Sequence, residues 1–494
     1  MNVMKKNNLI VVIGAGAGAI GVAYALKDLN KQVLIIDEQP YIGGTHVNAW
    51  VNVHAATSAP PFLEKVVEDI KDKIVYLDAG YQNFKDTSKL NYKMSLLHEK
   101  FVNPKYIDHN WQEVSIEFNP KDMREKYMKD LTASGNISMK FNTRFKRIEK
   151  EFVDSSGRKY IQKIVVENLL TKTEEVIEAA AFLDCSGDSV LIRAVDGNEL
   201  GTDYFLGIDR KNKFGNGTEP NNLNDTDIET ALNCPTLMYG VDGTHEDKSL
   251  PEVKYTDNGL LYEDTYNNIY INTISYLWLE GIDALKSKEW TYNYMRDELP
   301  RHWNTIKNGG NERFANWELK TKGFVGVAPM LGVRETYRTF CERMLTESDL
   351  YIQISSANMA EGDNLDKKIA VGNHSVDIHY VTKDGPNSGV QNIDTRKINE
   401  ALRPYGVPYG CIIPKGLSNV LVASRGAGLS HIAAASFRLN KDIMQLGWAA
   451  GKAVALYTDD KFKGGEKDFR FIDADLLQER MDFYKSVELL ESIM

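Results

Sequence analysis

Three small residues and one carboxylate near the start of the chain have the spacing of a nucleotide-binding site. Gly14, Gly16 and Ala19 form a Gly-x-Gly-x-x-Ala pattern, and Asp37 lies 21 residues after Gly16. In this pattern the first glycine makes a tight turn, the second lets the backbone approach a pyrophosphate, and a small third residue allows a helix to pack closely on a strand. The later carboxylate accepts hydrogen bonds from ribose hydroxyls. The spacing predicts a dinucleotide site that includes Gly14, Gly16, Ala17, Gly18, Ala19, Asp37 and Glu38.

The segments that carry these residues must be a strand, a helix and a second strand. Residues 9–13 are a β-branched block typical of a buried parallel strand, residues 19–32 read as a helix, and residues 32–37 are a second strand ending in the acid. The uncharged run 9–26, preceded by two lysines, also resembles a signal peptide or the shortest transmembrane span. Three glycines within five residues disfavour both alternatives, because each glycine weakens a helix by about 1 kcal/mol.

Composition limits the classes of function that the chain can have. The 494 residues suffice for two to three domains, and 43% hydrophobic with 26% charged residues is ordinary for a globular protein. A net charge of −10 argues against nucleic acid or an anionic membrane as a partner. Four widely spaced cysteines form no CxxC pair, so we expect no zinc, iron–sulfur or dithiol site. Scarce, unpaired cysteine is typical of the reducing cytoplasm, where we expect the protein.

The remaining sequence alternates between ordered blocks and one atypical region. Helices are expected after the Pro60–Pro61 pair, after an Asn119 cap, over 439–457 and in the tail from 473 to 490. Strands around turns are expected from 137 to 184, and a buried strand at 419–424 precedes a turn at 425–436. Residues 80–118 are irregular. The region 206–330 is rich in Asn, Asp, Tyr and Thr and reads as an inserted cap, whose aromatic residues either line a pocket or form its core.

Several further blocks carry a resemblance to a known family. These blocks are DEQPYIGGT (37–45), DCSGDSVL (184–191), GVRETYRTFCERMLTESDL (332–350), VDIHY (376–380) and an ungapped C-terminal segment (424–451). Together they resemble the FAD-dependent oxidoreductase family within the succinate dehydrogenase and fumarate reductase flavoprotein superfamily. The resemblance implies an α/β fold, in which a Rossmann-like FAD-binding domain of the glutathione-reductase type carries an inserted α+β substrate or cap domain. The domains would be 1–205 and 396–460 for FAD, 206–395 for the cap, and 461–494 for a helical tail.

The resemblance also implies which residues contact the cofactor. The additional FAD-binding candidates are Gly43, Gly44, Thr45, His46, Gly187, Asp188, Arg425, Lys441, Asp442 and Ile443. His46 lies near the place where succinate dehydrogenase flavoproteins carry a flavin-linked histidine, with His54 as a weaker candidate. Relatives in the oxidoreductase family mostly lack that covalent bond, so both non-covalent and covalent attachment stay open.

The catalytic candidates are the titratable or charged members of the matching blocks: His431, His379, Arg334 and Arg438. An imidazole beside the flavin can take the substrate proton as hydride leaves. We expect His431 to be that base; alternatively it only hydrogen-bonds its own loop, and His379 takes the role. Arg334 and Arg438 would bind a carboxylate, bind the flavin, or form structural ion pairs.

Three functions follow from these residues. The first is an FAD-dependent dehydrogenase or oxidase that transfers a hydride between a small organic substrate and flavin, with an unknown electron acceptor. The second is a flavin monooxygenase that requires NAD(P)H, although no second nucleotide-binding pattern is present. The third is a non-catalytic FAD-binding assembly subunit. A homo-oligomer is possible in each case, and the tail is a candidate subunit contact.

Overall fold

The computed structural model describes residues 9–54, 59–77, 115–195, 204–209, 232–243, 259–263, 266, 268–273, 281–309, 319–379, 381–382, 385–386, 395–459 and 467–493. A five-stranded parallel sheet forms the centre of this structure, in the order β21-β10-β1-β2-β6. Its strands are β1 (Leu9–Ile13), β2 (Gln32–Ile36), β6 (Ile137–Lys140), β10 (Ala181–Asp184) and β21 (Val420–Val422). Because all five strands run the same way, their carboxyl ends meet at one edge of the sheet.

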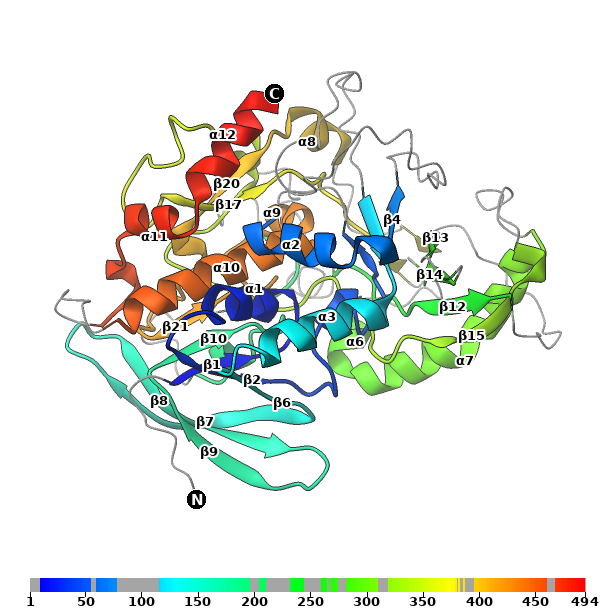
Figure 1. Cartoon of the computed structure of the whole chain (residues 1–494), viewed down its shortest axis with the longest axis horizontal. Helices are drawn as coiled ribbons and strands as arrows, with labels where there is room; N and C mark the ends of the chain where they lie inside the picture. Colours follow the sequence, from blue (N-terminus) through cyan, green and yellow to red (C-terminus); the bar gives the residue numbers. More distant parts are fainter. Residues whose placement is uncertain are drawn as a thin grey trace.

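Two helices that lie side by side cover one face of the sheet (Figure 1). These are α1 (Ala17–Leu26), which joins β1 to β2 as predicted, and α10 (Asn440–Tyr457). Glycines make their close approach possible: a Cβ at Gly21 would lie 2.3 Å from the carbonyl oxygen of Met444, and one at Gly447 would lie 2.0 Å from that of Gly18. The small residues of both helices therefore set the helix–helix contact.

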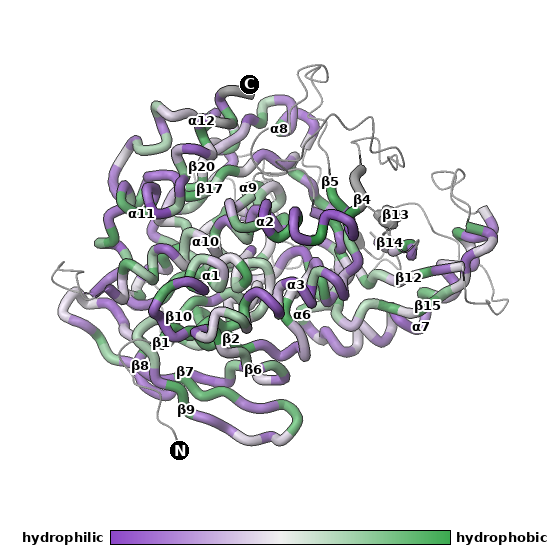
Figure 2. The backbone as a smooth tube through the Cα atoms, viewed as in Figure 1, coloured by the Kyte–Doolittle hydropathy of each residue, from purple (hydrophilic) through white to green (hydrophobic). Residues whose placement is uncertain are grey.

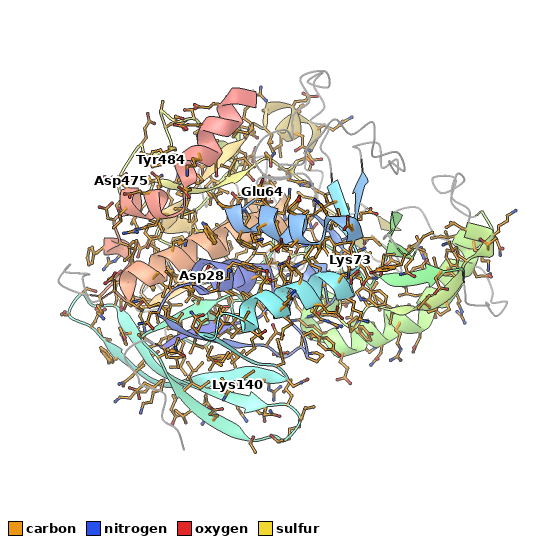
Figure 3. The ribbon with its side chains drawn as sticks, in the orientation of Figure 1. Asp28, Glu64, Lys73, Lys140, Asp475 and Tyr484 are labelled. Atoms are coloured by element: carbon orange, nitrogen blue, oxygen red, sulfur yellow. The ribbon has the colours of Figure 1, made fainter. Side chains whose placement is uncertain are left out.

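An antiparallel meander lies on the opposite side of the parallel sheet (Figure 1). It consists of β7 (Thr143–Val153), β8 (Lys159–Asn168) and β9 (Glu174–Glu178), in the region where strands around turns are predicted. Figure 2 shows hydrophobic residues concentrated in the central strands, whereas hydrophilic and hydrophobic residues are mixed along the meander. Several ion pairs include an exposed lysine or carboxylate, as at Lys140–Glu175, Lys73–Asp122 (2.6 Å) and Lys367–Asp475; Figure 3 labels Lys73, Lys140 and Asp475.

Two helices and a small sheet extend the main core. Helix α2 (Pro61–Asp69) begins after Pro60, and α3 (Pro120–Thr132) begins after Asn119, whose side chain accepts a hydrogen bond from the Lys121 amide at 2.9 Å. Strands β3 (Val53–His54), β4 (Ile74–Leu77) and β5 (Ser115–Phe118) form the small sheet. Most of the stretch predicted to be irregular, 80–118, lies outside the described residues.

A second hydrophobic core lies within residues 237–333. It is built from an antiparallel sheet, in the order β13-β14-β12-β15, and two helices. These elements are β12 (Tyr239–Asp242), β13 (Gly259–Glu263), β14 (Ile269–Thr273), β15 (Gly323–Val327), α6 (Gly281–Lys286) and α7 (Lys288–Lys307). Hydrophobic residues from Leu345 to Ile398 belong to the first core instead. That part of the sequence-based cap, 206–395, therefore packs with the parallel sheet.

The C-terminal part differs from the sequence-based expectation in two places. The turn predicted at 425–436 contains a helix, α9 (His431–Ser436), because the Ser430 side chain caps the Ala433 amide at 3.3 Å. The predicted tail helix is broken at Asp482, which has φ of 55°, into α11 (Ala474–Arg480) and α12 (Phe483–Ile493).

The other short elements are α4 (Val190–Arg193), α8 (Thr395–Ala401), β11 (Tyr204–Phe205), β16 (Arg338–Thr339), β17 (Lys368–Gly372), β18 (Val381–Thr382), β19 (Gly385–Pro386) and β20 (Tyr405–Pro408). No helix within the described ranges has both the length and the apolar character needed to cross a bilayer.

Candidate active site

A cavity of about 530 Å³ opens at the carboxyl ends of the parallel strands. This is where ligands bind in open α/β sheets, and the volume is in the usual range of ligand pockets. Its wall combines the turns after β1, β2 and β10 with residues of the second core and with the start of α10. The cavity therefore lies where the two cores meet.

The wall at the β1 turn is made mostly of backbone. Gly14 has φ of 95°, and a Cβ there would lie 2.5 Å from the carbonyl oxygen of Cys185, so only glycine fits this turn. A Cβ at Gly16 would meet only the Gly44 Cα, at 3.9 Å, because this position faces open space. The N-terminus of α1 thus presents backbone amides to the cavity, an arrangement that suits a phosphate.

Asp37 supports this turn from the end of β2. One carboxylate oxygen accepts the Ala15 amide at 2.5 Å, and the other accepts the Gln39 amide at 2.6 Å. Burial raises the pKa of Asp37 to about 6, although both backbone hydrogen bonds oppose that shift. Asp37 and the exposed Glu38 both line the cavity.

A second group of residues follows β10. The Arg425 guanidinium lies over Gly187, where a Cβ would be 3.1 Å from the guanidinium carbon, and is 3.5 Å from a carboxylate oxygen of Asp188. The other oxygen of Asp188 pairs with Lys288, the first residue of α7. Burial alone would raise the pKa of Asp188, but the charges of Lys288 and Arg425 hold it below its usual value.

The other end of the cavity holds a histidine oriented by a carboxylate. His379 Nε2 is 2.7 Å from Asp377 Oδ2, and the same oxygen accepts a hydrogen bond from Arg438 at 2.8 Å. The His379 amide donates to Asn233 Oδ1 at 2.6 Å, and its carbonyl accepts from the Cys234 amide at 2.8 Å. The backbone of His379 is therefore held on both sides.

Burial is the main reason that the pKa of His379 lies below its ordinary value, which favours the neutral ring near pH 7. Burial lowers its pKa, the hydrogen bond to Asp377 opposes that shift, and the Arg334 charge lowers the pKa further. Burial alone would raise the pKa of Asp377, but the bond from His379 and the Arg438 charge lower it below its ordinary value. Because an ionised carboxylate only accepts hydrogen bonds, the shared proton belongs to His379 Nε2, and Nδ1 is left as the acceptor.

Most of the sequence-predicted site residues line this one cavity. They are Gly14, Gly16, Ala17, Gly18, Asp37, Glu38, Gly44, Thr45, Gly187, Asp188, Arg334, His379, Arg425, Arg438 and Ile443. Of the aromatic residues expected in the cap, Tyr292 lines the cavity, Trp303 is buried in the second core, and Trp290 is exposed. Tyr276, Trp278 and Trp317 lie outside the described residues.

Six predicted residues do not line the cavity: Ala19, Gly43, His46, His431, Lys441 and Asp442. His431 is 1% exposed at the start of α9, where its backbone amide donates to Asp209 at 2.6 Å and its Nε2 is 3.6 Å from Glu335. His46 is fully buried, with Nε2 3.3 Å from the Tyr127 hydroxyl and its ring 5.3 Å from that of His54.

Sequence reasoning missed three cavity residues with charged or titratable side chains. Asp377, His374 and Lys288 were not proposed as site residues, yet all three line the wall. The signal for the first two was present, because the sequence H-S-V-D-I-H brings His374 and Asp377 within five residues of His379. Burial lowers the pKa of His374 to about 4, so it too is neutral. Lys288 had no local signal, because a lysine at the start of a helix is usually solvated.

The residues of the cavity fit FAD. The side-chain-free wall at Gly16 and Gly44 leaves room for a pyrophosphate, and Asp37 and Glu38 stand where a ribose would follow. The α10 N-terminus, whose first residue Asn440 lines the cavity, directs its dipole toward the opposite end.

Comparison with known families decides the identity of this nucleotide site. The family model described as FAD dependent oxidoreductase matches residues 10–481. The chain belongs to this family. It is therefore a flavin redox enzyme whose cofactor is FAD.

Solved structures similar to this FAD dependent oxidoreductase are distant from it. A flavoprotein/dehydrogenase from Cytophaga hutchinsonii is 13% identical with a TM-score of 0.42, covering 97% of this chain and 84% of that one. A p-nitrophenol 4-monooxygenase from Pseudomonas putida is 8% identical with a TM-score of 0.41, covering 99% and 89%. A glycerol-3-phosphate dehydrogenase from Bacillus halodurans complexed with FAD is 12% identical with a TM-score of 0.30, covering 54% and 47%. No curated protein matches the chain.

Proposed function

We propose that this flavoenzyme is a dehydrogenase or oxidase that oxidises a small organic molecule carrying a carboxylate, with His379 as the proton acceptor. One observation carries the proposal: the nucleotide-binding turn and the His379–Asp377–Arg438 group line the same cavity. When bound there, FAD supplies the two-electron acceptor. The protein must then hold the substrate, exclude water and remove one proton.

His379 has the geometry of a general base. Asp377 holds its Nε2 proton, so Nδ1 can accept a proton from the substrate. Arg438 in turn fixes Asp377 through its carboxylate and its carbonyl oxygen, at 2.8 and 3.0 Å. A base whose partner fixes its tautomer, and whose pKa lies below neutral pH, is ready in the form that catalysis needs.

Arg334 is the residue that we expect to bind the substrate carboxylate. Its Nη1 donates to the carbonyl oxygen of Cys234 at 2.9 Å, and within the described residues no carboxylate pairs with it. Arg438, in contrast, is already paired with Asp377. A half-buried guanidinium facing a cavity with unused N–H groups favours a planar anionic group, which it can bind through two parallel hydrogen bonds.

The wider context of the function belongs to the same proposal. The block resemblance supports membership of the succinate dehydrogenase and fumarate reductase superfamily, and a cytoplasmic location fits four buried, unpaired cysteines. The second core supports a cap role for part of 206–395, since it forms one wall of the cavity. Because His46 does not line the cavity, we expect FAD to be held without a covalent bond.

Anaerobic reduction of the purified enzyme tests the proposal. The protein should be yellow, release FAD on acid denaturation and keep no flavin mass on the polypeptide. A panel of small 2-hydroxy and 2-amino acids should then contain a compound that bleaches the flavin without NAD(P)H. Rapid reduction only by NADPH would instead show the monooxygenase function, and a flavin that no donor reduces would show the assembly-subunit function.

A further inference from the structure

Lys288 is a cavity residue that no short sequence pattern predicts. It is the first residue of α7, and its side chain lines the wall of the cavity near the nucleotide-binding turn. The side chain pairs with Asp188, which belongs to the turn after β10. An ion pair therefore joins the second core to the parallel sheet across the wall of the cofactor cavity.

The partner of Lys288 is itself well held. Asp188 is 16% exposed and lies between Lys288 and Arg425, which is 3.5 Å from its second carboxylate oxygen. On the α7 side, the helix is anchored by buried Met295, Leu299 and Trp303 in the second core. The Lys288–Asp188 pair thus connects a helix anchored in the second core with the turn that follows β10.

The same helix forms more of the cavity wall. Glu289 and Tyr292 also line the cavity, and the Tyr292 hydroxyl donates to the carbonyl oxygen of Ala328 at 2.9 Å. If the start of α7 moved away from Asp188, this wall would separate from the nucleotide-binding turn. A ligand lying against Gly16 and Asp188 would then be able to leave.

We propose that Lys288 is a cofactor-retaining residue, which acts by pairing with Asp188 and so holding the start of α7 closed over the nucleotide end of the cavity. The inference rests on the placement of FAD in this cavity. It assigns to the second core a part in cofactor retention, in addition to any contact with substrate. It also explains why a half-exposed lysine at a helix N-terminus, where the helix dipole disfavours a cation, pairs with a residue of another element.

The test is the rate at which the holoenzyme releases FAD, followed by the rise of free-flavin fluorescence after dilution at low salt. Lys288→Met removes the charge and keeps the aliphatic chain; release should become about 3- to 5-fold faster, the worth of a partly exposed ion pair. Lys288→Arg should retain the slow rate. Lys286→Met, at an exposed lysine two residues away that does not line the cavity, should leave the rate unchanged.

Salt and a second substitution separate the ion pair from a general loss of stability. Release from the wild-type enzyme should accelerate as salt rises, and release from Lys288→Met should respond less, because the screened pair is already absent. In an Asp188→Asn background, Lys288→Met should have no further effect. Equal release rates for wild type and Lys288→Met, or fully additive effects of the two substitutions, would overturn the inference. A wild-type protein that holds no FAD would overturn both this inference and the proposed placement of the cofactor.

Discussion

Gly16 and Gly18 are two positions apart, yet the structure gives them different roles. A side chain at Gly16 enters the cavity, whereas a side chain at Gly18 collides with the backbone of Ala423. We predict that Gly16→Val yields a folded protein without FAD, because the valine occupies the space of the pyrophosphate. Gly18→Val should instead lose the fold. Flavin absorbance and far-ultraviolet circular dichroism of both variants check the contrast, and a yellow Gly16→Val protein would contradict it.

The two candidate bases give a second contrast at the residue scale. We predict that His379→Asn keeps the fold and FAD but slows flavin reduction by about 100-fold, the usual worth of a general base. His431→Asn should lower thermal stability and leave the reduction rate nearly intact, because His431 is buried beside Glu335 and Asp209. The measurement is stopped-flow reduction by whichever acid of the panel reduces the enzyme. The opposite ranking of the two rates would return the role to His431.

At the residue scale, the sequence predicts the nucleotide-binding end of the cavity better than the end that holds His379. Gly14, Gly16 and Asp37 belong to one local unit, so their spacing alone places them together. His379 and Arg438 meet at Asp377 only because the segment 374–379 packs against α9 and the turn between α9 and α10, and no sequence spacing encodes that contact. His431 is misleading for the same reason: Arg425 and Arg438, six and seven residues away in the sequence, line the cavity, but His431 itself is buried at the start of α9.

At the scale of elements, the contact between α1 and α10 is sensitive to a single methyl group. A Cβ at Gly447 would lie 2.0 Å from the Gly18 carbonyl oxygen, so the helices must separate to admit it. We predict that Gly447→Ala destabilises the protein by about 1–3 kcal/mol, the usual cost of overpacking. Urea denaturation followed by circular dichroism measures this. Gly243→Ala, where a Cβ meets nothing within 4 Å, is the control; equal midpoints would contradict the prediction.

Elements were predictable where their signal is local and were mispredicted where one residue changes the outcome. The β1–α1–β2 unit and the Asn119 cap follow from short patterns, and both are confirmed. The glycines and alanines of 425–436 hide α9, which depends on the Ser430 cap. Nothing in the amphipathic pattern of the tail shows that Asp482 adopts a left-handed conformation and divides the helix in two.

At the scale of the whole molecule, the cavity is formed between two hydrophobic cores. The chain contributes first to one core, then to the second, and then to the first again. The second core is built within 237–333, and the chain returns to the first core from Leu345 onward. Composition marks the region 206–330 as different, but it does not show that residues 345–398 pack with the parallel sheet. The proposed active site uses both parts, because Tyr292 comes from the second core and His379 from the returning chain.

Buried histidines make the stability of the whole molecule depend on acid. His46, His54 and His302 are at most 2% exposed, and burial lowers the pKa of His46 and of His302 to about 3. For His54, burial and then the neighbouring His46 lower the pKa well below its ordinary value. The unfolded chain, with histidine pKa values near 6.5, therefore binds more protons than the folded protein at lower pH.

The sign of this linkage gives the last prediction. Stability is complete above about pH 6.5 and falls as the pH decreases toward about 3, by up to about 1.4 kcal/mol per pH unit for each histidine. Burial raises the pKa of Asp37 to about 6 and also raises that of Asp184, which gives the opposite sign. Burial lowers the pKa of His374 and of His379 as well, so five histidines act against these two carboxylates. His54→Phe should weaken the pH dependence of unfolding between pH 6.5 and 4.5 by about one proton, because neither His54 nitrogen has a hydrogen-bond partner to lose. Urea midpoints measured across that range give the pH dependence of stability. If stability changes with pH at the same slope in wild type and variant, His54 is protonated equally in the folded and unfolded states, and the prediction is wrong.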